Sequence, residues 1–261
     1  MELLLFILTM LAIGAGVGII SAALGVGGGL LMVPMFLYLH PEMDINTAKG
    51  SSLLIITFVA LYNTFRMNRG EMKNPFPLIL LIASASLLGG FIGGTITTLL
   101  SDTLTTWIFI GFILLAALRT FFLKEIIVHE QDVAQRSPLA FFIGLLSGTI
   151  SGATGTGGGA LFVPCALWSG IVSNKRVVAL SNAIMIAAAS AGAIAHLTAP
   201  ATLDTPWIIG RANISFAPAI ILGAIACAPV GRRINAHLSF KRRRVVMGVM
   251  LLIIAIRMLV R

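Results

Sequence analysis

Two glycine clusters are the residues in this sequence best suited to bind a ligand: Gly25-Val26-Gly27-Gly28-Gly29 and Gly155-Thr156-Gly157-Gly158-Gly159. Consecutive glycines leave backbone amides uncovered by side chains and permit dihedral angles that other residues rarely adopt. Where such a run precedes a helix, the first-turn amides have no intrahelical partner and attract negative charge. We therefore predict a small-anion site whose donors are the backbone amides of Gly27, Gly28, Gly29, Gly157, Gly158 and Gly159. The alternative is that these glycines only allow helices to pack closely.

A second set of polar residues lies close to the glycines in the sequence. Under the offset of 130 residues that relates the two clusters, Ser51-Ser52 aligns with Ser181-Asn182. Hydroxyl and amide groups can donate to an anion, and they can equally hydrogen-bond neighbouring helices. We predict Ser51, Ser52, Ser181 and Asn182 as ligands, and a second tier of candidates comprises Ser21, Asn63, Ser151, Thr154 and Thr156.

The composition indicates where these residues must be held. The chain is 58% hydrophobic, its mean hydropathy is +1.02, and only 10% of its 261 residues are charged, whereas a soluble domain carries roughly a quarter. Apolar runs approach or exceed the roughly 20 residues that cross a bilayer. The sequence therefore predicts an all-α polytopic membrane protein, and its net charge of +9 reflects short basic loops and not nucleic-acid binding.

The chain is also a duplication. Between residues 14–34 and 144–164, 12 of 21 positions are identical, and both copies end in Val-Pro at Pro34 and Pro164. These prolines are predicted to be structural and to fix a bend or a helix start. We predict a first transmembrane repeat (1–123), a polar linker (124–137) and a second repeat (138–261). The ten apolar segments are about 3–24, 28–40, 47–66, 76–99, 103–123, 138–154, 158–171, 175–197, 210–232 and 243–260.

Segments 28–40 and 158–171 are too short to span the bilayer alone, so we predict eight full spans and two glycine-broken half-spans. Fourteen Lys and Arg residues follow or adjoin odd-numbered segments, against four after even-numbered segments and at the termini. This bias predicts that the odd loops are cytoplasmic and that both termini lie outside. Because each half has five segments, the two halves are predicted to form an inverted-topology repeat, with a binding site at the short segments.

Groups for other chemistry are scarce. All nine acidic residues fall in loops or at segment ends, and His196 is predicted to lie at the membrane interface rather than in a proton relay. The anion site would then be polarised by backbone amides, without any buried Lys or Arg. Cys165 and Cys227 lack metal-ligand spacing, so neither a metal nor a cofactor is expected. An intramembrane hydrolase would need a Gly-x-Ser-Gly serine, and the serines at 147 and 151 have the wrong spacing.

The segments GVGGGLLMVP (25–34), AKGSSLL (48–54) and GTGGGALFVP (155–164) resemble the sulfite exporter TauE/SafE family, also called the toluene-sulfonate uptake permease family. The resemblance covers essentially the whole chain. It implies an inner-membrane permease for small sulfur-containing anions such as sulfite, sulfonates or sulfoacetate. One departure is that Leu180-Ser181-Asn182 stands where the first half has Gly50-Ser51-Ser52.

The function predicted from these features is secondary transport of a small anion by alternating access between the two repeats. Two alternatives remain at this point: an anion channel built on the same duplication, and a non-transporting membrane assembly factor. The expected partners are the anion and the lipid bilayer. The sequence does not specify the substrate, the direction of transport, the coupling ion or the oligomeric state.

Overall fold

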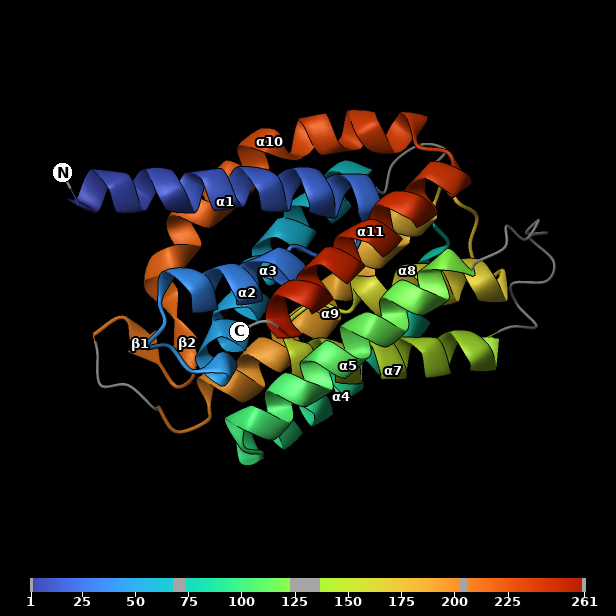
Figure 1. Cartoon of the computed structure of the whole chain (residues 1–261). Coiled ribbons are helices and arrows are strands. Elements are labelled where there is room, and N and C mark those ends of the chain that lie inside the picture. Colours follow the sequence, from blue (N-terminus) through green and yellow to red (C-terminus); the bar gives the residue numbers. More distant parts are fainter. Residues whose placement is uncertain (1, 68–73, 123–136, 202–205, 260–261) are drawn as a thin grey trace.

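The computed structural model describes residues 2–67, 74–122, 137–201 and 206–259, and within these ranges it contains ten α-helices and one short hairpin (Figure 1). The first half forms α1 (Glu2–Leu24), α2 (Gly29–Leu39), α3 (Ile45–Met67), α4 (Phe76–Leu99) and α5 (Asp102–Phe121). The second half forms α7 (Ser137–Thr154), α8 (Gly159–Ser169), α9 (Val177–Leu197), α10 (Ala217–His237) and α11 (Phe240–Leu259). The predicted all-α class is confirmed. The polar linker, apart from Ser137, lies outside the described residues.

Six of the predicted full spans are confirmed by length and apolarity: α1, α3, α4, α7, α9 and the stretch that contains α10. Helices α2 and α8 have 11 residues each, or about 16 Å of helix against a hydrocarbon core of about 30 Å. Helices α5 and α11 have 20 residues each but are not in the set of six. In α11 the reason is visible in the sequence, because its first turn contains Lys241, Arg242, Arg243 and Arg244.

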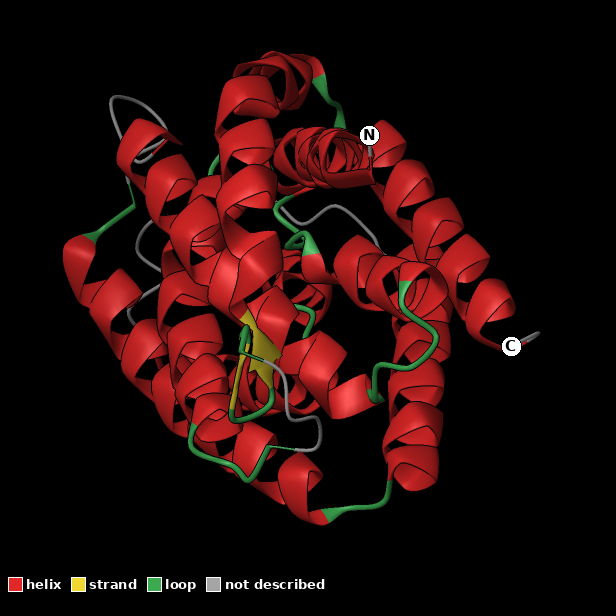
Figure 2. Ribbon diagram, turned by 90° about the vertical axis from the view of Figure 1, so that its left-hand side faces the viewer, coloured by secondary structure: helices red, strands yellow, loops and turns green. Residues whose placement is uncertain are grey.

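Helices α3 and α9 form the centre of the bundle (Figure 1), which is helical apart from the short strands (Figure 2). Their most apolar windows are 72% and 78% buried, against 28% to 44% for the other four long spans. The most extensive packing around this centre joins α1 to α10 and α4 to α7, and α5 lies along α11. Each of these pairs takes one helix from each half of the chain. The two halves are therefore interleaved and do not form separate bundles.

Glycines make the two most extensive helix pairs possible. In the α4–α7 pair, a Cβ on Gly93 would collide with the carbonyl of Thr149, and one on Gly148 with the carbonyl of Ser86. In the α1–α10 pair, Gly18 faces the carbonyl of Ala224 in the same way. Small residues that let helix backbones approach closely are typical of membrane-helix interfaces. At these positions the packing explanation for glycine holds.

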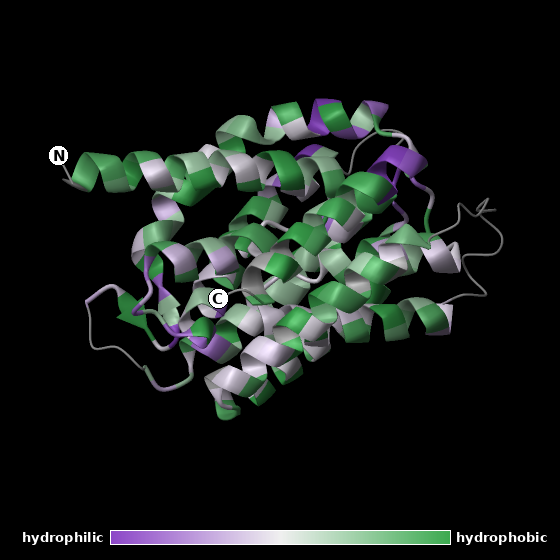
Figure 3. Ribbon diagram, in the orientation of Figure 1, coloured by the Kyte–Doolittle hydropathy of each residue, from purple (hydrophilic) through white to green (hydrophobic). Residues whose placement is uncertain are grey.

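The outside of the bundle is apolar along the helices and polar toward their ends (Figure 3). Large hydrophobic side chains such as Phe65 and Phe91 are exposed, as expected where lipid replaces water. The three tryptophans of the chain, Trp107, Trp168 and Trp207, are all at least half exposed and lie near helix ends or in the hairpin. Tryptophan is enriched at this level of a membrane protein, where the bilayer meets water.

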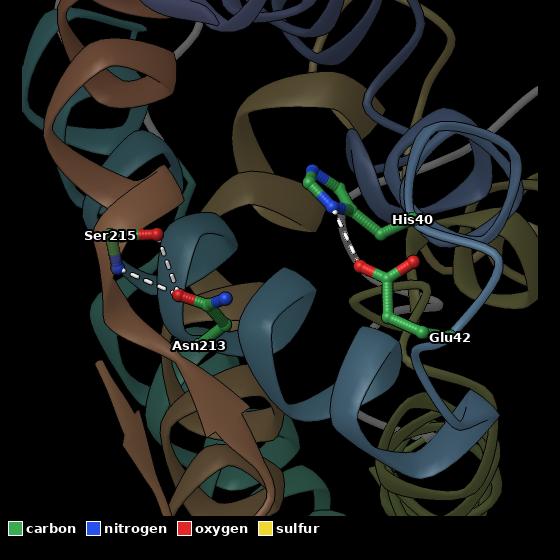
Figure 4. Close-up of polar contacts among 4 residues, drawn as sticks. All are labelled: His40, Glu42, Asn213 and Ser215. Atoms are coloured by element: carbon green, nitrogen blue, oxygen red, sulfur yellow. Dashed lines mark hydrogen bonds and ion pairs between the residues drawn. The ribbon is translucent and has the colours of Figure 1, made fainter. Parts of the chain in front are cut away.

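A hairpin of β1 (Ile208–Ile209) and β2 (Ala212–Asn213), followed by the 3-10 turn η2 (Ile214–Phe216), occupies the start of the segment that the sequence assigns to a helix from about residue 210. Gly210 takes the left-handed conformation at the turn, with φ of +56°. The Asn213 side chain accepts hydrogen bonds from the backbone and hydroxyl of Ser215 (Figure 4), so α10 begins only at Ala217. Figure 4 also shows the nearby His40–Glu42 pair, with 3.1 Å between Nδ1 and Oε1, in the connection between α2 and α3.

Candidate functional site

Both glycine clusters interrupt a helix, and we call the two interruptions break one (Gly25–Gly28) and break two (Gly155–Gly158). Each break has left-handed backbone angles that favour glycine. In break one these angles occur at Gly25 and Gly27, with φ of +70° and +78°. In break two they occur at residues 155, 157 and 158, with φ of +73°, +83° and +79°. The breaks therefore differ at one position, because Gly28 has φ of −74°.

Six glycine amides in the two breaks and at the first residues of α2 and α8 are unpaired donors. Among the described residues, no hydrogen bond to a protein acceptor is formed by the N–H groups of Gly27, Gly28, Gly29, Gly157, Gly158 and Gly159. All six residues are buried. Buried backbone donors are almost always paired with protein, water or ligand. These six amides lie at or just before the N-termini of α2 and α8, where a helix attracts negative charge.

The two breaks touch each other in a reciprocal way. A Cβ built on Gly29 would collide with the carbonyl oxygen of Gly155, and one built on Gly159 would collide with the carbonyl oxygen of Gly25. Under the 130-residue offset Gly29 corresponds to Gly159 and Gly25 to Gly155, so the two contacts are equivalent in the two halves. Ile56 and Met185 lie beside Gly157, so apolar side chains border the meeting point.

Two serines hold the breaks in place across the two halves. Ser52 on α3 donates from Oγ to the carbonyl of Gly155 at 2.8 Å, and Ser181 on α9 donates from Oγ to the carbonyl of Gly25 at 2.6 Å. Both side chains are fully buried. Ser51 lies apart from the breaks, since it donates to Thr47 and accepts from the backbone amide of Asn213 at 2.8 Å. The structural counterpart of Ser181 is therefore Ser52, one residue away from the partner that sequence alignment gives.

Three further candidates meet beside break one. Asn63 donates from Nδ2 to Asn182 Oδ1 at 3.2 Å and to Ser21 Oγ at 3.3 Å, and Ser21 Oγ lies 3.5 Å from the same Asn182 oxygen. Asn182 also donates to the carbonyl of Val178 within its own helix. The cluster joins α1, α3 and α9 and is buried throughout. Its Asn63 Oδ1 atom is buried without a hydrogen-bond partner.

The candidates beside break two form a different arrangement. Ser151, the counterpart of Ser21, has a buried Oγ without a partner, and so does Ser147 one turn earlier in α7. A Cβ on Gly158 would lie 3.3 Å from the Cβ of Ser151 and 2.9 Å from the carbonyl oxygen of Ser147. Thr154 and Thr156 are 2.9 Å apart between their hydroxyl oxygens. Ser147 and Ser151 thus add two unpaired hydroxyl donors to the amides of break two.

The prediction that the site contains no buried cation is wrong. Lys49, one of the four basic residues counted with the even-numbered segments and the termini, lies inside α3 with 0% exposure, and its Cα is 2.8 Å from a Cβ built on Gly155. His196, in the last turn of α9, is also fully buried, and its Nε2 lies 3.3 Å from the carbonyl oxygen of Gly152. The available signal was the place of Lys49 in AKGSSLL, two residues before Ser51.

Arg243 is a second cation that the sequence assigns to a loop. It lies in the first turn of α11, is 2% exposed, and donates to Asn174 Oδ1 at 2.9 Å, to Asn235 Oδ1 at 2.8 Å and to the carbonyl of Ala23 at 3.0 Å. Ala23 belongs to the last turn of α1, where carbonyls lack intrahelical donors and a cation is favourable. Arg243 therefore anchors the helix end that leads into break one.

Pro34 and Pro164 lie inside α2 and α8, five residues after the first residue of each helix. They do not start these helices, so that part of the prediction is wrong. Since proline has no N–H, each removes one helical hydrogen bond.

Comparison with known proteins gives consistent findings over nearly the whole chain. The family described as "Sulfite exporter TauE/SafE" matches residues 10–258. A probable membrane transporter protein of Haemophilus influenzae is 27% identical over 223 residues, which cover 84% of this chain and 81% of that protein. A probable membrane transporter protein of Methanocaldococcus jannaschii is 26% identical, covering 99% of this chain and 97% of the relative. For one from Bacillus subtilis the identity is 25%, over 96% of each chain. No solved structure matches the chain.

Proposed function

Because the chain belongs to the sulfite exporter TauE/SafE family of multi-pass membrane transporters, we propose that it is a secondary transporter for small sulfur-containing oxyanions. Sulfite, sulfonates and sulfoacetate are small anions, the class of ligand that backbone amides at helix N-termini attract. The family consists of membrane transporters and not of enzymes. The observation that carries the proposal is the set of six buried, unpaired glycine amides at the N-termini of α2 and α8.

The proposed architecture is a pair of inverted repeats, residues 1–123 and 138–261. Support comes from the helix packing. In the two repeats α1 corresponds to α7, α3 to α9, α4 to α10 and α5 to α11. The α1–α10 pair therefore corresponds to the α7–α4 pair, and the α3–α9 and α5–α11 pairs each consist of two corresponding helices. The reciprocal contacts of the two glycine breaks follow the same exchange. We place the chain in the inner membrane with both termini outside, because the basic loops favour that orientation.

The proposed anion ligands are the amides of Gly27, Gly28, Gly29, Gly157, Gly158 and Gly159. Ser147 and Ser151 would add hydroxyl donors next to break two, where Lys49 supplies a nearby positive charge. Ser52 and Ser181 have a different role, since their hydroxyl hydrogens already serve the carbonyls of the breaks. They would position the donors without binding the anion themselves. Asn182, with Ser21 and Asn63, would do the same for the end of α1.

Transport through this site requires movement of the protein. The breaks and the polar side chains around them are buried, so this conformation gives the aqueous phases no access to the proposed ligands. The natural moving parts are the two interleaved halves, which meet at α3 and α9. A buried centre favours alternating access over the channel alternative, because a channel needs a continuous wet path.

The test is uptake of labelled sulfite, thiosulfate, sulfate and taurine by liposomes that contain the purified protein. We expect saturable uptake of at least one sulfur oxyanion, and its loss in Gly158→Ala, since residue 158 has φ of +79° and lies against Ser147 and Ser151. Gly16→Ala is the matched control, because a Cβ at Gly16 meets nothing within 4 Å.

Equal uptake by Gly158→Ala and Gly16→Ala would contradict the proposed site. Flux that does not saturate would favour the channel. An assembly factor would instead give no flux for any anion and a changed abundance of a partner protein.

A further inference from the structure

His196 is a buried titratable residue that the proposed anion site does not use. Its side chain has 0% exposure, and its Nε2 lies 3.3 Å from the carbonyl oxygen of Gly152. The other ring nitrogen, Nδ1, is buried and has no hydrogen-bond partner among the described residues. A neutral ring that donates from Nε2 to Gly152 leaves a lone pair on Nδ1. That lone pair can accept a proton.

The ring lies next to break two. Gly152 is in the last turn of α7, three residues before Gly155, where helix carbonyls lack intrahelical donors and favour a positive charge. Gly155 in turn packs on the backbone and Cβ of Lys49, with 2.8 Å to Cα and 2.9 Å to Cβ from a Cβ built on the glycine. His196 and Lys49 therefore border the same break from α9 and α3.

The charges around the imidazole are few and can be named. Two basic residues lie near the ring, Lys49 from α3 and Arg211 from the hairpin, whose backbone N–H donates to the His196 carbonyl at 2.9 Å, and one acidic residue, Asp44, lies just before α3. The described parts of α4, α7 and α8, which also pack near α9, contain no charged residue. Positive charge is thus in excess around a neutral ring. An anion in break two would offset that excess and make a protonated ring favourable.

We propose that His196 is the proton-binding residue of this transporter, taking up one proton when an anion occupies break two and releasing it when the anion leaves. The proton is transferred from a hydronium ion of the aqueous phase: its O–H bond breaks, a water molecule is released, and an N–H bond forms at Nδ1. Thermodynamic linkage makes the effect reciprocal: protonation must strengthen anion binding by the same factor by which the anion strengthens protonation. The inference rests on the anion site of the proposed function.

The experiment measures sulfate and methanesulfonate binding and proton movement in liposomes that contain the protein. Both probes keep the same charge between about pH 5 and pH 8, the range in which histidine titrates, so any pH dependence belongs to the protein. For one linked proton we expect affinity to rise up to about tenfold per pH unit of acidification, with one proton entering per anion. His196→Gln keeps an amide donor for the Gly152 carbonyl but cannot titrate. Its affinity should not change with pH.

His237→Gln is the matched control, because His237 is exposed and also contacts a backbone carbonyl, with Nδ1 at 2.9 Å from that of Arg233. This variant should keep the full pH dependence. An unchanged pH slope in His196→Gln, or anion entry without protons in the unsubstituted protein, overturns the inference while leaving the anion site intact. The proton-to-anion ratio of the unsubstituted protein decides the matter even if His196→Gln does not fold. Absence of any anion binding in the unsubstituted protein overturns the proposed function together with this inference.

Discussion

The hydrogen bonds from Ser52 to Gly155 and from Ser181 to Gly25 predict a specific loss of stability. Replacing either serine by alanine leaves a carbonyl oxygen of the opposite half buried and unpaired. An orphaned buried acceptor costs about 1–3 kcal/mol, and interhelical hydrogen bonds in membranes are worth about 0.6 kcal/mol on average and up to about 1.7. With bonds of 2.8 and 2.6 Å in a fully buried setting, we expect a loss of about 1–2 kcal/mol for each variant.

The two bonds should also be energetically coupled. They hold breaks that contact each other through Gly29 and Gly155 and through Gly159 and Gly25. When one bond is lost, its break can shift and displace the break that it contacts, so the second bond is already weakened. We therefore expect the double variant to lose less than the sum of the single losses, by at least about 0.5 kcal/mol.

The assay is equilibrium unfolding in mixed micelles of mild detergent and sodium dodecyl sulfate, followed by tryptophan fluorescence. Ser190→Ala is the matched control on α9, because Ser190 is only half-buried and donates within its own helix, to Ala187 at 3.1 Å. Its loss should stay within about 0.5 kcal/mol. Losses no larger for Ser52→Ala and Ser181→Ala than for this control, or strict additivity of the pair, would refute the claim that the two halves lock each other's breaks.

Three further predictions follow from the packing. Gly29→Ala should abolish transport, because its Cβ would collide with the carbonyl of Gly155, whereas Gly16→Ala on α1 should transport normally; uptake into liposomes compares them, and equal rates would contradict the prediction. Arg243→Lys should destabilise the protein by about 2–4 kcal/mol, because an ammonium cannot reproduce the three-way guanidinium contacts; an unfolding midpoint equal to that of the unsubstituted protein would show that the anchor is dispensable. Gly93→Ala should lower the thermal unfolding midpoint by forcing α4 away from α7, while Gly111→Ala, with open space around it, should not; equal midpoints would disprove the close-packing role.

Much of the fold could be predicted from sequence patterns. The glycine clusters and the length of the apolar runs locate the helices to within a few residues, apart from α10, which runs from Ala217 to His237 where the prediction was about 210–232. The start of α10 was missed because Gly210, Asn213 and Ser215 make a tight hairpin and cap, and their local hydrogen bonds override the apolar character of Ile208 and Ile209.

The orientation of individual side chains could not be predicted in the same way. Sequence alignment pairs Ser51 with Ser181, but neighbouring residues on a helix point about 100° apart, and the register in the folded chain makes Ser52 the equivalent residue. Only the position of α3 beside break two in the folded chain reveals this shift.

The burial of two basic side chains was also not predicted from the sequence. Lys49 and Arg243 follow polar connections, so a one-dimensional reading places them in water. In the fold, the N-terminal turns of α3 and α11 are covered by the other half of the chain and by the hairpin. Arg243 can be kept there because the Ala23 carbonyl and the side chains of Asn174 and Asn235 stand where water would otherwise be.

The most direct test of the central claim is nuclear magnetic resonance of the protein with ¹⁵N-labelled glycine in lipid nanodiscs, titrated with sulfite. We expect the amide proton signals of Gly27–Gly29 and Gly157–Gly159 to move as they become hydrogen-bonded to the anion, while those of Gly16 and Gly111 stay in place. Saturable sulfite transport with unmoved signals from both breaks would contradict an anion site at the glycine amides, because the anion would then bind elsewhere in the protein.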